Sequence, residues 1–212
     1  LGPGSLIETQ MMLVRSKPII ERTVNALKLY EMPVDYESGF TTRLNRIFID
    51  HDTKKFKQEL EEMTPEQRKT VLFNKAVGEL SGKINTVLIG ETSSMFAITV
   101  VDFNPALAGK IANVLSRSYV IFDLEQQIAE LQLTYGEKND TIRKLENYID
   151  RLKETLDGRI LPDIEAIGPA SVKIVAQAGY CSMVPMRPDV NNALIAAFII
   201  SIVAGVVLAF VF

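Results

Sequence analysis

The chain ends in a long apolar run. Residues 193–212 contain no charged side chain, and only Ser201 and Gly205 lie outside the apolar set. Coiled as a helix, this run would extend about 30 Å, which is the thickness of the hydrocarbon core of a bilayer. The pattern predicts a transmembrane helix over residues 190–212.

Small residues recur at every fourth position of this predicted helix. Lipid offers no hydrophobic driving force between helices, so such a row lets a second helix approach closely. The alternative is that the row only reflects the abundance of Ala and Gly in membrane helices. The residues predicted to form this packing row are Ala193, Ala197, Ser201, Gly205 and Ala209.

The N-terminal part of the chain shows helical spacing of apolar residues. Ser16 can cap a helix that has Pro18 in its first turn, and the pattern predicts helix over residues 17–30. Residues 31–40 contain turn-forming residues and are expected to form a loop. A second helix, with less distinct ends, is expected within residues 42–63.

A clearer helix start follows. Thr64 is a good cap, Pro65 suits the first helical position, and Gln67 can complete a capping box. The apolar pattern favours a helix from there to about residue 80, and Gly82 can terminate it.

Two β-branched and aromatic runs then predict a β-hairpin. They cover residues 84–89 and 95–103, and residues 90–94 between them favour a turn. Asn104 and Pro105 are typical of the start of the helix that follows.

A heptad-like seam of apolar residues runs over residues 121–156 and predicts a helical arm at about residues 105–160. Gly136 interrupts the seam, so either one long helix has a weak point there or two helices fold back as an αα-hairpin. We favour the hairpin, because Asn139 or Asp140 can cap a second helix. The residues predicted to pack this arm are Leu145, Ile149, Leu152 and Leu156.

The region between the arm and the apolar run is predicted to be extended. Apolar and polar residues alternate in the second half of residues 168–178, which predicts a final strand. Pro185 and Pro188 then predict a stiff connector into the membrane helix.

Charge and composition narrow the class of protein. All charged residues precede the predicted span, the formal net charge is −3, and basic residues are dispersed, so a nucleic-acid partner is not expected. Cys181 is the only cysteine, which excludes an intramolecular disulfide. Residues 1–5 have the composition of an expression-tag remnant, which leaves residues 6–189 as one soluble domain.

The residues that carry chemistry do not form a recognisable catalytic set. The glycines are scattered, and none precedes a Lys-Ser or Lys-Thr pair, so a nucleotide site is not expected. His51 between Asp50 and Asp52 is more typical of a solvated polar stretch than of an acid–base or metal site. We therefore expect a protein that is not an enzyme and has no cofactor and no metal.

Four short motifs, in order along the chain, carry a resemblance to a known family. They are Ile7-Glu8-Thr9-Gln10, Asp102-Phe103-Asn104-Pro105-Ala106-Leu107-Ala108, Tyr135-Gly136-Glu137-Lys138-Asn139-Asp140, and the spaced Ser182, Pro185 and Pro188. In this order the chain resembles the polysaccharide co-polymerases, which are the chain-length determinant proteins of bacterial inner membranes. The third motif resembles Tyr-Gly-x-Lys-His-Pro of the exopolysaccharide branch.

The resemblance implies an α+β protein with a membrane-proximal α/β base domain in the periplasm, a helical arm and a transmembrane helix. It implies a first strand and a first membrane helix ahead of this sequence, and ring-like homo-oligomers. Such proteins set chain length with a polysaccharide polymerase, or couple polymerisation to export through an outer-membrane export protein. One alternative is the membrane and periplasmic module of a bacterial tyrosine kinase. The other is a tail-anchored coiled-coil scaffold.

Overall fold

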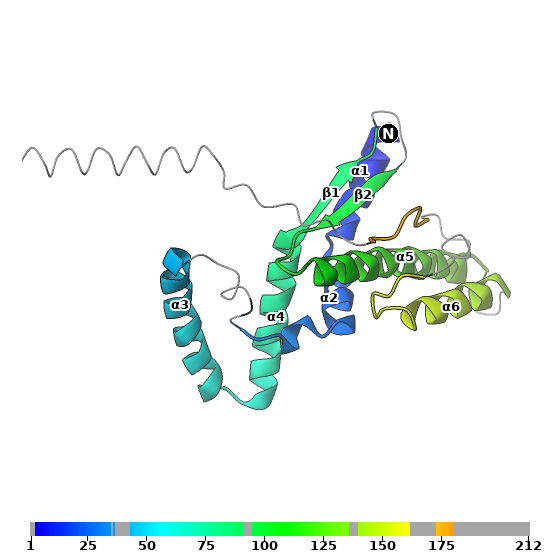
Figure 1. The fold of residues 1–212 in the computed structure, drawn as a ribbon. Helices are drawn as coiled ribbons and strands as arrows, with labels where there is room; N and C mark the ends of the chain where they lie inside the picture. Colours follow the sequence, from blue (N-terminus) through cyan, green and yellow to red (C-terminus); the bar gives the residue numbers. More distant parts are fainter. Residues whose placement is uncertain are drawn as a thin grey trace, which may run out of the picture. The chain divides into compact units, whose positions relative to one another are not determined.

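The part of the chain that the computed structural model describes is residues 3–34, 36, 43–90, 95–135, 140–161 and 173–179. The chain divides into two units, Leu1–Cys181 and Ser182–Phe212, and all of the described residues lie in the first. They form a mostly helical, loosely α+β arrangement with one small sheet (Figure 1). The elements are α1 (Pro3–Val14), α2 (Lys17–Ala26), the 3-10 helix η1 (Leu29–Glu31), α3 (Arg43–Glu62), α4 (Pro65–Lys83), β1 (Ile84–Leu88), β2 (Phe96–Val100), α5 (Pro105–Tyr135) and α6 (Asp140–Lys153).

The chain begins with a helix that the sequence pattern did not predict. α1 starts at Pro3, so its first turn includes residues that we had set aside as a tag remnant. α2 begins where helix was expected but ends at Ala26 rather than at residue 30, because Lys28 adopts a left-handed backbone with a φ of +50° before η1. Ser16 does not cap α2 through its side chain. Pro18 has no N–H, and the N–H of Ile19 donates to the backbone oxygen of Ser16. The buried hydroxyl of Ser16 therefore has no hydrogen-bond partner among the residues that the structure describes.

α3 and α4 follow the predicted pattern, with one correction. The capping box is present, since Thr64 Oγ1 accepts from Gln67 N at 3.3 Å and Thr64 N donates to Gln67 Oε1 at 3.1 Å. The expected stop at Gly82 is wrong, because the helix continues to Lys83 and β1 begins at the next residue. The N–H of Val101 donates to Lys83 O at 3.0 Å, so pairing with the second strand fixes the point where helix becomes strand.

The predicted β-hairpin is confirmed. β1 and β2 pair antiparallel from Ile84 opposite Val100 to Leu88 opposite Phe96. The residues of one sheet face, Ile84 and, on β2, Phe96, Ile98 and Val100, pack into an apolar cluster with α2, α4 and α5. We call this the base cluster, and its buried members are Val14, Ile19, Ile20, Val24, Ala76, Leu80, Ile84, Ile111, Leu115 and Tyr119.

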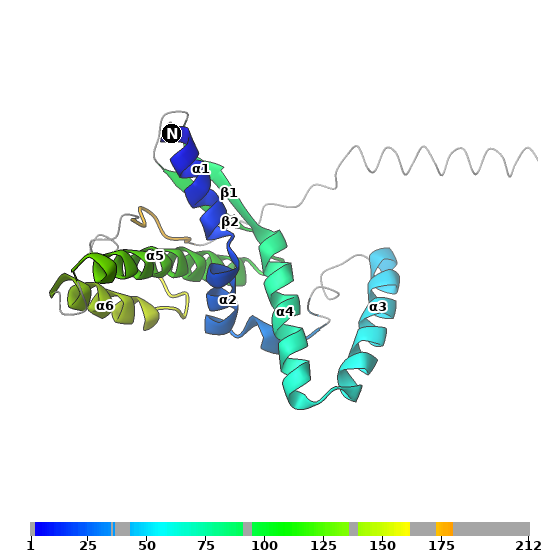
Figure 2. The ribbon, with the colours of Figure 1, turned by 180° about the vertical axis from the view of Figure 1, so that it is seen from behind.

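α5 begins as predicted, with Asn104 Oδ1 accepting from the N–H groups of Ala106 at 3.0 Å and Leu107 at 3.3 Å. Its second half packs against α6, so the seam folds back as the αα-hairpin that we favoured (Figures 1 and 2). We call the apolar contact between the two helices the hairpin cluster. Its buried members are Val120, Ile121, Leu124, Leu145, Ile149 and Leu152.

The predicted final strand is wrong for its described part. Residues 173–179 form no regular secondary structure and belong to no sheet that the structure describes. The physical reason is that the backbone of Ala178 forms its hydrogen bonds with the side chain of Asn113 in α5 rather than with a strand.

The predicted membrane helix, residues 190–212, lies outside the described residues, as do its packing row, Pro185, Pro188 and Cys181. Among the helices that the structure describes, none is both long enough and apolar enough to cross a membrane.

Candidate functional site

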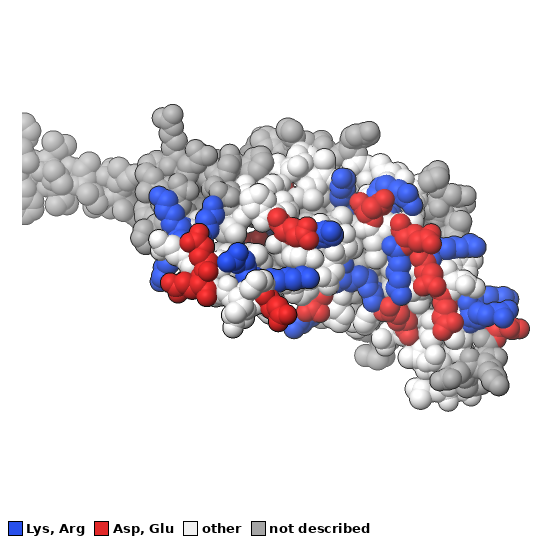
Figure 3. Space-filling model, turned by 90° about the horizontal axis from the view of Figure 1, so that it is seen from below, with Lys and Arg blue, Asp and Glu red and all other residues white. Residues whose placement is uncertain are grey.

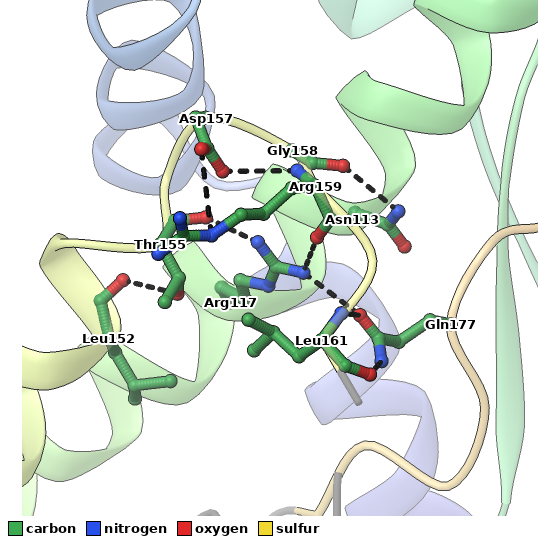
Figure 4. A network of polar contacts seen from close by, with 9 residues as sticks. All are labelled: Asn113, Arg117, Leu152, Thr155, Asp157, Gly158, Arg159, Leu161 and Gln177. Carbon is green, nitrogen blue, oxygen red and sulfur yellow. Dashed lines mark hydrogen bonds and ion pairs between the residues drawn. The ribbon is translucent and has the colours of Figure 1, made fainter. Parts of the chain in front are cut away.

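A buried polar cluster lies where α5 meets the two segments that follow α6 (Figure 4). Its central residues, Asn113 and Arg117, are one helical turn apart on α5, with 4% and 1% of their surfaces exposed. The facing segments are residues 155–161 and residues 177–178. We call the group the polar clamp, and its members are Asn113, Arg117, Thr155, Gly158, Arg159, Leu161, Gln177 and Ala178.

Arg117 holds the segment that follows α6. Its guanidinium donates to the carbonyl oxygens of Thr155 and Arg159, and to Oε1 of Gln177 at 2.9 Å. Both carbonyl groups lie beyond Lys153, the last residue of α6, so the guanidinium cation lies near the negative end of the helix dipole, where a cation is favourable. Burial lowers the pKa of Arg117, while Asp157 raises it and Arg159 lowers it. Arginine loses its proton only far above neutral pH, so the clamp contains a buried cation.

Asn113 holds the C-terminal segment through both ends of its amide. Oδ1 accepts from Ala178 N at 2.8 Å, and Nδ2 donates to Ala178 O at 3.1 Å. Nδ2 also donates to Gly158 O at 3.2 Å. Two bonds to one backbone residue reproduce what a neighbouring strand would supply, so the segment is fixed without a sheet.

Gln177 and Gly158 complete the clamp. The N–H of Leu161 donates to Gln177 Oε1 at 2.9 Å, and Gln177 Nε2 donates to Leu161 O at 2.8 Å. Gly158 has a φ of +79°, and a Cβ there would lie 2.9 Å from the backbone oxygen of Lys110. Only glycine combines this left-handed backbone with such close approach to α5.

A second polar cluster joins the ends of α4 and β2. Asp102, whose side chain is 2% exposed, accepts from Lys83 Nζ at 3.0 Å, from the hydroxyl of Tyr36 at 2.9 Å and from the N–H of Asn104 at 2.9 Å. A cavity of about 170 Å³ lies beside it. Asn104 caps α5, so the hydrogen bond from its N–H to Asp102 positions the start of that helix.

A larger cavity, of about 530 Å³, lies between β2, α5 and the segment 173–178. Tyr119 contributes to its floor, and burial raises the pKa of this phenol to about 12, with a smaller contribution from Asp123.

The structure brings together part of the residues that the sequence singled out. Leu145, Ile149 and Leu152 are buried between α6 and α5, and Leu156 is half-buried against the same cluster. Their packing partners are therefore in this chain. His51 lies in α3, but its side chain is not among those the structure describes.

Neither the clamp nor the Asp102 cluster was predicted from the sequence. One signal was present, because Arg117 interrupts an otherwise apolar and small-residue run from Ile111 to Ile121, where a charge must find partners to be buried. In the described residues, no three His, Cys, Asp or Glu side chains are grouped so that they could hold a metal ion.

The chain was compared with protein families, with curated proteins and with solved structures. No family model, no curated protein and no solved structure matches it.

Proposed function

We propose that this chain is a periplasmic domain and membrane helix of a bacterial inner-membrane polysaccharide co-polymerase. In this role it regulates the chain length of a surface polysaccharide or exopolysaccharide, or couples its polymerisation to export. The four ordered motifs and the apolar run at residues 193–212 support the proposal. It acts as a scaffold, without catalysing a reaction and without a cofactor.

The observation that carries the proposal is the construction of α5. This one helix of 31 residues contributes its first half to the base cluster and its second half to the hairpin cluster. A base and an arm that share a continuous helix, with the polar clamp at their junction, are suited to transmit a fixed geometry between subunits.

The expected partners are further copies of the chain, a polysaccharide polymerase, membrane lipid and, in the export role, an outer-membrane export protein. Nucleic acid is not expected. On the face drawn in Figure 3, acidic and basic side chains are interspersed, whereas a nucleic-acid surface gathers basic side chains.

Complementation of a deletion strain tests the proposal. Leu145→Asp places a charge in the hairpin cluster, so we expect it to broaden or shift the length distribution of the extracted polysaccharide on a gel. Asn147→Asp adds the same charge at an exposed position of α6 and should leave the distribution unchanged.

The deletion strain itself gives the decisive comparison. An unaltered length distribution there would refute the chain-length role. Complete loss of polymer would instead identify export coupling as the main role.

A further inference from the structure

Residues 173–179 pack on the hairpin cluster and not on the base cluster. Ile174 is half-buried against the hairpin cluster. Farther along, Gln177 and Ala178 form hydrogen bonds of the polar clamp. Among the residues that the structure describes, none of this segment belongs to the base cluster. The segment therefore supports the part of the molecule where two helices contact each other through a single face.

Gln177 joins this segment to the chain that follows α6 (Figure 4). Its Oε1 accepts from Arg117 Nη2 and from Leu161 N, both at 2.9 Å, and its Nε2 donates to Leu161 O at 2.8 Å. The same Nη2 donates to the carbonyl oxygen of Arg159. Removal of the Gln177 side chain therefore frees Leu161 directly and takes one partner from the guanidinium that holds Arg159.

Asn113 serves both segments with one amide group. Its Nδ2 donates to Gly158 O at 3.2 Å and to Ala178 O at 3.1 Å, while its Oδ1 accepts from Ala178 N at 2.8 Å. The two bonds to Ala178 fix the plane of the amide, so they also aim Nδ2 at Gly158. Hydrogen bonds that share a group in this way strengthen one another, so departure of residues 177–178 weakens the hold on residues 158–161.

The position of this segment in the chain gives the shared bonds a direction. The first unit ends at Cys181, and the second begins at Ser182. Counted back from that boundary, Ala178 and Gln177 are the first described residues that hydrogen-bond to the rest of their unit. Because the backbone is continuous, a displacement of the chain at the boundary reaches these bonds before it reaches α6.

We propose that residues 173–179 are a releasable strap for the hairpin. When the strap is bound to the polar clamp, it holds α6 against α5, and when it is released, α6 separates while the base cluster stays folded. Coupling between two equilibria is reciprocal, so separation of α6 also loosens the strap. A displacement at the end of the first unit thereby changes the arm without unfolding the base. The proposal does not depend on a role in polysaccharide synthesis.

Two neighbouring apolar residues of the strap give a matched test. Ile174→Ala removes a side chain that packs on the hairpin cluster, and Val175→Ala removes one that is 72% exposed. Hydrogen exchange of the full chain, followed by mass spectrometry, measures the opening of α6. We expect Ile174→Ala to raise the exchange rate of α6 at least fivefold and Val175→Ala to leave it unchanged. Equal rates in the two variants would overturn the proposal.

Gln177→Ala tests the hydrogen bonds of the strap. It removes three bonds of the clamp, so we expect the exchange rate of α6 to rise at least tenfold while that of α2 stays unchanged. An unchanged rate in α6 would show that the strap does not hold that helix, and an equal rise in α2 would show that the unit opens as a whole. Either result contradicts the proposal. If this variant fails to fold, the comparison of Ile174→Ala with Val175→Ala decides.

Reciprocity supplies an independent check. Leu152→Ala truncates a leucine of the hairpin cluster, and Leu80→Ala truncates a similarly buried leucine of the base cluster. The readout is exchange of the amide of Ala178, which donates to Asn113. We expect Leu152→Ala to speed this exchange at least fivefold and Leu80→Ala to leave it unchanged. Equal exchange in the two variants, or a larger effect of Leu80→Ala, would refute the coupling between strap and hairpin.

Discussion

The base cluster and the hairpin cluster lie on the same helix but are closed in different ways. Around the first half of α5, side chains from α1, α2, α4 and β1 enclose the helix. An ion pair from Arg22 of α2 to both carboxylate oxygens of Glu125, at 2.7 and 2.9 Å, reaches the start of the second half. The second half of α5 has one helical neighbour in its apolar cluster, α6. Its outer side is open, since Leu133 is 89% exposed.

The difference shows why a polar clamp occurs at the junction. A cluster enclosed by several elements is stabilised by apolar burial alone. Two helices that contact each other through a single face can separate when their ends are free, because few other contacts oppose their separation. Arg117 and Asn113 fix the end of α6 and the chain beyond it, so the open cluster depends on the clamp and the enclosed cluster does not.

Loss of Arg117 should have the largest effect. Arg117→Ala removes the guanidinium donor of the part-buried carbonyl oxygens of Thr155 and Arg159, and each unsatisfied group costs about 1–3 kcal/mol, so we expect a loss of about 4 kcal/mol in unfolding free energy. Urea denaturation measures it. Arg143→Ala removes an exposed arginine and should cost less than about 0.5 kcal/mol. Similar losses in both variants would show that the clamp is not required.

A charge in the hairpin cluster should separate the two regions. Leu145→Asp is expected to cost about 3 kcal/mol, because a carboxylate replaces a fully packed side chain. Hydrogen exchange measured by mass spectrometry should show lost protection in α6 and in the second half of α5, and retained protection in α2. Equal loss in α2 would mean that the two clusters unfold as one unit.

Two glycine variants compare a tight position with an open one. Gly158→Ala forces a Cβ against Lys110 at a positive φ, so we expect thermal or urea unfolding to show a loss of about 2 kcal/mol. Gly82→Ala has open space inside α4 and should stabilise the protein by about 0.5–1 kcal/mol. A destabilising effect at Gly82 would contradict the observed continuation of α4 to Lys83.

Substitution of Tyr119 in the base cluster should change the free energy of unfolding least at neutral pH. Tyr119 is 4% exposed, and burial raises its pKa to about 12 from an ordinary value near 10. The unfolded chain loses this proton first, so stability should fall as the pH rises from about 10 to about 12. Tyr119→Phe should change stability little at pH 7 and should reduce the fall. Absorbance at 295 nm during a pH titration would show whether one tyrosine ionises late.

Local signals in the sequence predicted most of the helices and the β-hairpin. The capping box at Thr64 and the cap at Asn104 each act within three residues, so the pattern contains the whole interaction. The fold-back at Gly136 was also readable, since the seam continues on both sides of it.

The polar clamp could not be read in the same way. Its bonds join Arg117 to partners 38, 42 and 60 residues further along the chain. Alternation at residues 173–178 predicted a strand, but the hydrogen-bonding partner of Ala178 is a side chain of α5, which alternation does not encode. The stop expected at Gly82 failed for a related reason, because pairing of Lys83 with Val101 sets the end of α4.

Because α5 is continuous, the number of its residues determines how the arm is rotated about the helix axis relative to the base cluster. Each residue inserted into a helix turns everything beyond it by about 100° and advances it by about 1.5 Å. One extra residue after Tyr119 would therefore rotate the arm away from Asn113 and Arg117. Seven would restore the azimuth to within about 20° but displace the arm by about 10 Å. The arm can change length in evolution only at its tip, by matched heptads added to the end of α5 and the start of α6.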